Sequence, residues 1–265
     1  MADEVVLYEV RDGVAYITLN RPERLNAFSQ RMNVELSRLW QYFKNDDTAD
    51  VAIITGTGRA FSAGADLRDD YVPEEAGRDP LLYPWLGSGG ATMGVWPREL
   101  KLGKPTIAAV NGMALGVGGV IVLQCDMRIC VEETGTIGYP LVRAGLMPPR
   151  LQDLWLVAPP AMALKALMTG EAITPEEAFR VGMINEVVPA DRLMEAATEL
   201  AQKIRRNAPL PVRAVKEMWD SDPSYQDAIL LRMYQTFQSV VNASEDRAEG
   251  VNAFREKRAP KWKGL

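Results

Sequence analysis

Two glycine-containing turns are the part of this sequence best suited to chemistry by the main chain alone. One is GTGRAFSAGADL at residues 56–67, and the other is NGMALGVGG at residues 111–119. Each turn follows a short apolar run, VAIIT or TIAAV, that predicts a buried strand. The N–H groups at the start of a helix have no partner inside the helix. Two such groups that converge on one oxygen form an oxyanion hole, which polarises a carbonyl or thioester and holds the enolate formed from it.

Neither turn matches a nucleotide-binding motif. The dinucleotide fingerprint G-x-G-x-x-G requires a third glycine, and Phe61 and Ile121 occupy that position in the two turns. The P-loop motif requires Ser or Thr after Gly-Lys, but Pro105 follows the single Gly-Lys pair of the chain. Close packing of backbone on backbone also explains a lone glycine turn. The shared form of the two turns, a buried strand, a glycine loop and a helix start, favours the oxyanion hole.

The amino-acid composition narrows the chemistry that the chain can perform. No histidine occurs among its 265 residues, which excludes Ser-His-Asp and Cys-His catalysis and histidine-ligated metals. A general acid or base must therefore be a carboxylate, a lysine, a tyrosine or a cysteine. Cys125 and Cys130 are too few for a disulfide framework or a zinc site. We expect no metal and a reducing, cytoplasmic setting.

Charge and hydropathy exclude further classes of partner. The net charge of −5 gives no basic field for nucleic acid or anionic lipid. The longest apolar run has about 14 residues, which fits a buried core helix better than a membrane span. The acidic N-terminal sequence MADEVVLYEV lacks the basic region of a secretory signal. We therefore expect no nucleic-acid partner and no membrane insertion.

Hydrophobic periodicity predicts an α/β protein. Apolar runs on either side of Asp12-Gly13 predict a β-hairpin of residues 5–10 and 14–19. A helix is expected from about Gln30 to Phe43, and a capping box at Thr174-Pro175-Glu176-Glu177 begins another that stops at Gly182. Residues 71–100, rich in glycine, proline and acid, predict a surface loop or lid. Further strands are expected at residues 51–55, 106–110, 127–131, 136–140 and 185–189.

Several segments together resemble the crotonase (enoyl-CoA hydratase/isomerase) superfamily. They are RPERLNAFS, VAIITGTGRAFSAGADL, KPTIAAVNGMALGVGG, CDMRI, MTGEAITPEEAFRVGMINEVVP and EGVNAFREKRAPKW. The resemblance extends from about Val5 to Trp262. It implies a spiral of ββα units at residues 1–200 and a C-terminal helical trimerisation region at residues 201–265. It also implies an acyl-CoA thioester substrate, with coenzyme A as part of the substrate rather than a cofactor, and a homotrimer or a hexamer built as a dimer of trimers.

The resemblance also assigns roles to individual residues. The N–H groups of Ala65 and Val117 match the two donors of the family's oxyanion hole. Lys257 matches a basic residue that meets the CoA phosphates of a neighbouring subunit. The other residues expected to contact the acyl-CoA are Arg24, Leu25, Ala63, Gly64, Asp66, Leu67, Gly118 and Leu141.

The sequence departs from the family at the acid–base positions. Val120 and Leu141 stand where hydratases of the family carry glutamates. Pro149 and Pro148 stand where other branches carry an aspartate or a tyrosine. Asp153, in the altered loop that follows, is the carboxylate we consider first as a substitute. Three functions remain open: an acyl-CoA enzyme of enolate chemistry, a non-catalytic acyl-CoA-binding protein, and a thioester decarboxylase or hydrolase. The acyl group is not specified.

The last part of the chain predicts amphipathic helices. From about residue 209, apolar residues recur at helical spacing in two consecutive segments. Such stripes predict an interface between subunits, unless the helices fold back onto their own core. The two stripes are Val212, Val215, Met218 and Trp219, and then Ile229, Leu230, Met233, Tyr234 and Phe237.

Overall fold

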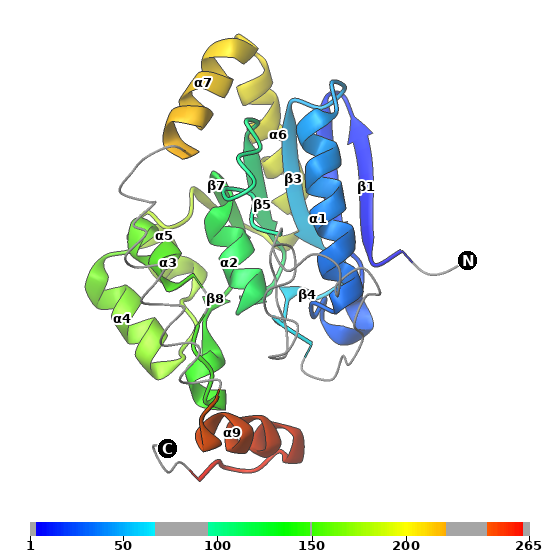
Figure 1. Cartoon of the computed structure of the whole chain (residues 1–265). Coiled ribbons are helices and arrows are strands. Elements are labelled where there is room, and N and C mark those ends of the chain that lie inside the picture. The colour runs from blue at the N-terminus through cyan, green and yellow to red at the C-terminus, as the bar shows by residue number, and fades with distance from the viewer. Residues whose placement is uncertain (1–3, 67–94, 149, 221–242, 262–265) are drawn as a thin grey trace.

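The computed structural model describes residues 4–66, 95–148, 150–220 and 243–261, and it confirms an α/β fold. Its centre is a six-stranded sheet in the order β1-β2-β3-β5-β7-β9 (Figure 1). A second sheet has the order β4-β6-β8. The strands of the large sheet are Val6–Arg11, Val14–Leu19, Val51–Gly56, Thr106–Val110, Met127–Val131 and Glu186–Val188, and those of the small sheet are Ala60–Ser62, Met113–Leu115 and Ile137–Gly138.

The pairing of the strands confirms the predicted hairpin and the buried strands. β1 and β2 pair antiparallel across the Asp12-Gly13 turn, and every later pair in both sheets is parallel. Three successive units each place a longer strand in the large sheet and a short strand in the small one. The strand expected at residues 136–140 is shorter than predicted. It ends at Gly138 because Pro140 begins a 3-10 helix and has no N–H to continue the ladder.

Helices cover both faces of the large sheet. Successive residues of a strand point to opposite faces of the sheet. Ile53 accordingly packs toward α6, whereas Ile54 packs into the larger cluster with α1 and α2. This double cover explains why β3 and β5 are almost wholly apolar. The helices and 3-10 helices are α1 Gln30–Asn45, α2 Val117–Gln124, α3 Leu151–Val157, α4 Pro160–Thr169, α5 Pro175–Arg180, α6 Leu193–Arg205, α7 Pro209–Asp220, α9 Glu245–Glu256, η1 Pro22–Arg24, η3 Pro140–Ala144 and η4 Ala190–Arg192.

Local capping explains where several helices begin and end. Ser29 accepts a hydrogen bond from the Met32 N–H at the start of α1. The predicted capping box is present at α5, where Thr174 and Glu177 satisfy each other's backbone N–H groups. At the other end of α1, the ammonium of Lys104 donates to the carbonyls of Phe43 and Asp46 at 2.9 and 2.7 Å. These contacts hold α1 against the parallel strands.

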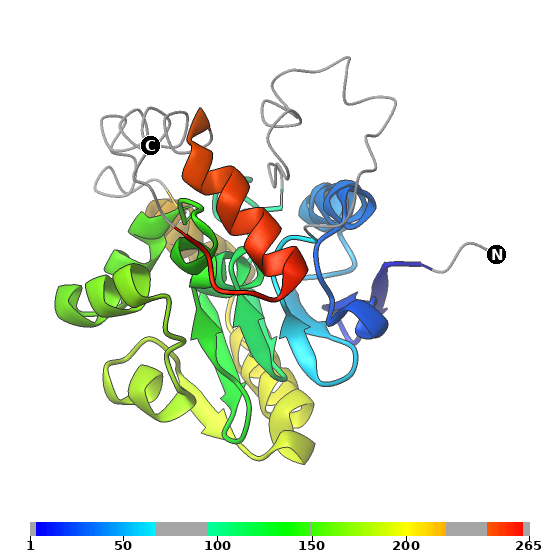
Figure 2. The ribbon, with the colours of Figure 1, turned by 90° about the horizontal axis from the view of Figure 1, so that it is seen from below.

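The C-terminal helices make different contacts. α6 runs across residue 200, the predicted domain boundary, and packs on the large sheet; the division into two domains stays a prediction. α9 packs on η3 (Figure 2). Gly250 makes this contact possible, because a Cβ there would lie 2.0 Å from the carbonyl oxygen of Ala144. The second predicted apolar stripe, Ile229 to Phe237, and residues 71–94 of the predicted lid lie outside the described residues.

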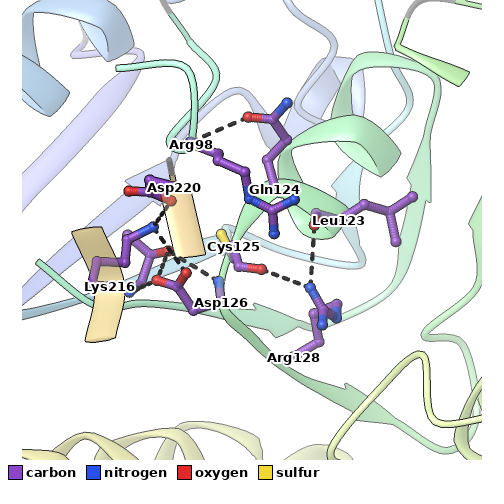
Figure 3. A network of polar contacts seen from close by, with 9 residues as sticks. Arg98, Leu123, Gln124, Cys125, Asp126, Arg128, Lys216 and Asp220 are labelled. Carbon is purple, nitrogen blue, oxygen red and sulfur yellow. Dashed lines mark hydrogen bonds and ion pairs between the residues drawn. The ribbon is translucent and has the colours of Figure 1, made fainter. Parts of the chain in front are cut away.

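Helix α7 buries charge and exposes apolar side chains. Lys216 and Asp220 are buried, whereas Val215 and Met218 are 69% and 76% exposed. Figure 3 shows the Lys216 ammonium between two carboxylates, 2.9 Å from Asp126 Oδ1 and 2.7 Å from Asp220 Oδ1. The guanidinium of Arg98 lies over the Trp219 ring at 4.9 Å. This buried ion cluster ties α7 to the point where α2 leads into β7.

No helix in the described part of the chain has both the length and the apolar character that a membrane crossing requires.

The ion cluster predicts an unusual response of stability to pH. Burial raises the pKa of Asp220, which outweighs the lowering by Lys216, and the charge of Asp126 raises it further. A raised pKa means that the ionised form costs stability at neutral pH, and the cost disappears as the pH falls below the pKa of the unfolded chain. We expect Asp220→Asn to raise the melting temperature at pH 7, with a gain that shrinks toward about pH 4. Thermal unfolding at several pH values measures it.

Two controls accompany that measurement. Asp47→Asn, at an exposed position, should show no pH-dependent gain. Lys216→Met should lower the free energy of unfolding by about 3–5 kcal/mol, because it leaves two carboxylates without their buried cation. An Asp220→Asn protein that is less stable than the wild type by the same amount at every pH would contradict the prediction.

Candidate functional site

The first glycine turn is held by the segment that precedes α1. The Phe28 N–H donates to Gly64 O over 2.7 Å, and the Asp66 N–H donates to Phe28 O over 3.0 Å. These bonds pair Phe28 with Ala65 in the parallel manner. In a parallel pair, the residue between the two bonded groups turns its own N–H and C=O to the other side. The N–H of Ala65 therefore points away from Phe28.

Two buried side chains, Asn26 and Ser62, fix the shape of this turn. The Asn26 amide donates to the carbonyls of Thr57 and Ala60 at 2.9 and 2.8 Å. Ser62 Oγ donates to Asn26 O at 2.8 Å and accepts from the Gly64 N–H at 3.1 Å. Asn26 has a positive φ of 53°, a conformation that asparagine tolerates. Neither positioning residue was predicted from the sequence, although each lies in a segment that carries the family resemblance.

The second turn begins helix α2. Gly116 has φ 53° and ψ −116°, a conformation open to glycine but strained for other residues. Its N–H donates to Gly138 O at 2.8 Å, and its carbonyl accepts from the Val120 N–H at 3.0 Å. Val117 is the first helical residue. Its N–H therefore lies in the first turn of α2, where no intrahelical acceptor exists.

The other glycines of the second turn permit close packing. A Cβ on Gly112 would lie 2.2 Å from Arg59 O, and one on Gly118 would lie 2.6 Å from Ser62 Cβ. A Cβ on Gly119 would lie 3.1 and 3.2 Å from two carbonyl oxygens. Close packing thus explains three of the four glycines, and backbone conformation explains Gly116.

The two turns meet in space. A Cβ on Gly64 would lie 3.0 Å from Leu115 O and 3.7 Å from the Cα of Gly116. In return, a Cβ on Gly116 would lie 3.7 Å from the Cα of Gly64 and 3.4 Å from Cδ1 of Leu141. The structure therefore brings Ala65 and Val117, each the residue after one of these glycines, to one place. Leu141, on η3, borders it.

The surroundings of the two turns are apolar. Phe61, Trp96 and Val120 are buried in the same hydrophobic cluster, against which Ala65 and Leu141 pack. No group of three or more His, Cys, Asp or Glu side chains that could hold a metal ion occurs within the described ranges. This arrangement can polarise an oxygen with main-chain N–H groups in a medium of low polarity, where such interactions are strong.

Comparisons with known proteins place the chain among CoA-thioester enzymes. The family model "Enoyl-CoA hydratase/isomerase" matches residues 9–265. The chain is 36% identical over 266 residues to (E)-benzylidenesuccinyl-CoA hydratase of Thauera aromatica, with 98% of this chain and 99% of that protein covered. It is 35% identical over 254 residues to 2,3-dehydroadipyl-CoA hydratase of Escherichia coli K12, with 95% of each covered. The crystal structure of carnitinyl-CoA hydratase from Mycobacterium avium superposes with a TM-score of 0.81 at 33% identity, covering 98% and 99%.

The chain belongs to the enoyl-CoA hydratase/isomerase family. Its α/β architecture is the crotonase fold of its structural neighbours. Members of the family are enzymes that act on CoA thioesters.

This family member has apolar side chains at the two positions where the resemblance places the glutamates of hydratases. Val120 is fully buried in α2, and Leu141 borders Gly116. Tyr139, beside Leu141, is fully buried as well. The guanidinium of Arg143 donates to Thr169 O at 2.9 Å. Arg143, two residues after Leu141, therefore contacts the end of α4.

Asp153 lies at a distance from the two turns. Its side chain is fully buried on α3 and accepts hydrogen bonds from Gln124 Nε2 at 3.0 Å and Arg150 Nε at 3.3 Å. Gln124 is the last residue of α2, about 10 Å along the helix axis from Val117. The contacts of Asp153 are those of a carboxylate that joins α3 to α2.

The remaining predicted residues fall in three places. The Ala63 N–H donates to Leu25 O at 2.9 Å, so Arg24 and Leu25 of the η1 turn border the first glycine turn. Asp66 pairs with Arg21 at 3.1 Å. Lys257 is exposed and ends α9 with φ 54°. Leu67 lies outside the described residues.

Proposed function

We propose that the protein binds an acyl-CoA thioester with the carbonyl oxygen between the N–H groups of Ala65 and Val117. The observation that carries this proposal is the meeting of the two turns at Gly64 and Gly116. The orientation of the Ala65 N–H and the position of Val117 at the start of α2 support it. The positive end of the α2 dipole adds to the attraction for an oxygen that gains negative charge.

The proposed chemistry is stabilisation of an enolate. As negative charge develops on the thioester oxygen, both N–H groups strengthen their hydrogen bonds, and this lowers the barrier to forming the enolate. The apolar walls exclude water, which strengthens these bonds further. Val120 and Leu141 can neither donate nor accept a proton, so they cannot activate water. Similar proteins are named hydratases and dehydratases. If this site also catalyses hydration, another residue must act as the acid or base.

A second candidate function is binding of an acyl-CoA without hydration. The apolar side chains of Val120 and Leu141 favour this function, because they cannot transfer protons but leave the backbone donors of the thioester site in place. Decarboxylation or hydrolysis of the thioester also needs the oxyanion hole without both glutamates. Screening the purified protein against a panel of acyl-CoAs by mass spectrometry, scored for binding and for turnover, separates these functions.

Removal of one N–H donor tests the proposed oxyanion hole. Proline is tolerated at the first position of a helix, and α4 and α5 of this chain both begin with proline. We expect Val117→Pro to lower the rate of acyl-CoA turnover by about 10²–10³-fold, because a lost donor leaves the oxyanion less stabilised. Val117→Ala, which keeps the N–H and shortens the side chain, is the matched control. Equal rates in the two variants would show that this N–H does not act on the substrate.

The apolar acid–base positions predict slow hydration of crotonyl-CoA. General acid–base catalysis contributes about 10²–10⁴-fold, so we expect turnover to fall at least that far below that of a hydratase with both glutamates. The decrease in absorbance of the enoyl thioester measures the rate. A rate equal to that of such a hydratase would mean that another residue replaces the glutamates.

We also propose that the chain assembles as a trimer, or as a hexamer of two trimers. The exposed apolar face of α7 supports this, since exposed apolar patches of this kind mark interfaces. Its members are Leu210, Val215, Met218 and Trp219. In such an assembly Lys257 would contribute to a neighbour's CoA site. The two buried free thiols, Cys125 and Cys130, suit the reducing cytoplasmic setting that we propose.

Light scattering of the purified protein tests the assembly. We expect a trimeric or hexameric mass at micromolar concentration, and a smaller mass for Met218→Glu, because a charge on the apolar face opposes its burial. Glu217→Gln, at the neighbouring exposed position, should leave the mass unchanged. A monomeric mass of the wild-type protein would rule out the assembly and the role of Lys257 across a subunit boundary.

A further inference from the structure

The side chain of Ser62 lies between the two glycine turns. It is fully buried at the end of β4. Its Oγ accepts a hydrogen bond from the Gly64 N–H at 3.1 Å. A Cβ on Gly118 would lie 2.6 Å from Ser62 Cβ and 3.1 Å from Ser62 Oγ. Gly64 precedes Ala65 in the chain and Gly118 follows Val117, so Ser62 contacts the immediate neighbours of both proposed oxyanion donors.

The Ser62 hydroxyl is itself held in place. It donates to Asn26 O at 2.8 Å, and the Asn26 amide donates to the carbonyls of Thr57 and Ala60 at 2.9 and 2.8 Å. A hydroxyl that donates one hydrogen bond accepts another more strongly, because the two bonds polarise each other. The Gly64 N–H is therefore bound to an oxygen whose position is set by the turn between β3 and β4.

Gly64 is the point at which the first turn can rotate. Its φ of 94° is open to glycine and strained for other residues. The trans peptide between Gly64 and Ala65 carries Gly64 O and the Ala65 N–H on opposite edges, and the Phe28 N–H holds the oxygen edge at 2.7 Å. Ser62 thus fixes the peptide on one side of the Gly64 Cα, and Phe28 fixes the peptide on the other. Both bonds are needed to give the Ala65 N–H one direction.

Loss of the Ser62 hydroxyl would release the first of these restraints. It would leave the buried Gly64 N–H without an acceptor, which is unfavourable. The turn can relieve this by rotating at Gly64, since glycine meets little steric resistance. Such a rotation displaces the Ala65 N–H, and a small misplacement of a group that acts on the substrate costs much of its effect.

We propose that Ser62 is the positioning residue of the oxyanion hole. Its hydroxyl directs the Ala65 N–H, and its Cβ, packed against Gly118, seats the start of α2 and with it the Val117 N–H. This inference rests on the proposed binding of a thioester between the two N–H groups, and it assigns the alignment of both donors to one side chain. Because Ser62 is buried and contacts the neighbours of the donors, it acts on the polarisation of the thioester carbonyl through the main chain.

Infrared difference spectroscopy of a bound thioester tests the inference. Butyryl-CoA and octanoyl-CoA, isotopically labelled at the thioester carbonyl carbon, are saturated and so cannot be hydrated. Hydrogen bonds to a carbonyl weaken the C=O bond and lower its stretching frequency. We expect the tighter-binding thioester to have a lower carbonyl frequency on the wild-type protein than free in solution. Ser62→Ala, which keeps the Cβ against Gly118, should lose about half of that lowering or more, because one of the two donors is misaligned.

Thr106→Val is the matched control. Thr106 is fully buried at the start of β5, at the opposite end of that strand from the second glycine turn, and its hydroxyl donates to Asp126 Oδ2 at 2.9 Å. The variant should lower the melting temperature, as Ser62→Ala does, because each loses a buried hydrogen bond. It should nevertheless keep the full lowering of the carbonyl frequency. An equal loss in the two variants would show a general loosening of the fold and overturn the inference.

The outcomes separate this inference from the proposed function. If neither thioester binds the wild-type protein, or if the bound carbonyl has the frequency of the free thioester, the oxyanion hole itself is wrong and the inference falls with it. If the wild type and Ser62→Ala lower the carbonyl frequency equally, the proposed function stands and the inference is overturned. Should Ser62→Ala fail to fold, Ser62→Cys replaces the oxygen by a sulfur that hydrogen-bonds more weakly. An unchanged frequency in that variant overturns the inference as well.

Discussion

The approach of Gly64 to Gly116 is the constraint on which the rest of the structure depends. At these two positions the main chains come so close that a Cβ on Gly64 would press on Leu115 O at 3.0 Å, and a Cβ on Gly116 would touch the Cα of Gly64 at 3.7 Å. The contact requires β4 and β6 to lie side by side, Asn26 and Ser62 to tie the first turn, and Gly118 to admit α2 onto the small sheet. The parallel sheets, the short second strand of each unit and the buried helix α2 together hold this one contact.

Several buried charged and amide side chains lie at the opposite end of α2, among them Gln124, Asp153, Lys216 and Asp220. The first seven residues of α2 are apolar or glycine, and Gln124 alone carries a polar side chain. Beyond it, the bonds of Gln124 to Asp153 and to the Arg98 N–H, together with the Lys216 ion cluster, connect α2 with α3, α7 and the segment before β5. Buried charges of this kind are held by one another rather than by water, so each depends on its neighbours. Helix α2 thus has an uncharged start with backbone donors and an end fixed by side chains.

Much of the local structure could be predicted from sequence, because it depends on neighbours in the chain. The hairpin at Asp12-Gly13, helix α1 and the capping box of α5 are examples, and each is confirmed.

Contacts between distant segments could not be predicted. The apolar stripe of α7 was visible in the sequence, but periodicity does not tell which face of the helix lies inward. The structure buries Lys216 and Asp220 because Asp126, far away in the sequence, supplies the opposite partner. The bond of Asp153 to Gln124 could not be predicted for the same reason, because Gln124 is 29 residues away in the sequence. Arg150 is close in sequence, but its contact depends on a positive φ that the sequence does not predict. For the glycine turns, the sequence left packing and chemistry as alternatives, and the distances give Gly112, Gly118 and Gly119 a packing role.

The contact of Gly250 with Ala144 couples the C-terminal helix to the shape of the site. Helix α9 sits on η3 because position 250 has no side chain, and η3 carries Leu141 to the edge of Gly116. Beyond α9 the backbone turns back, where Glu249 accepts hydrogen bonds from Arg258 and from the Lys261 N–H. An affinity tag fused at the C-terminus would therefore disturb the packing of α9 on η3 and, through η3, the position of Leu141. A tag at the N-terminus is the better choice for enzymology.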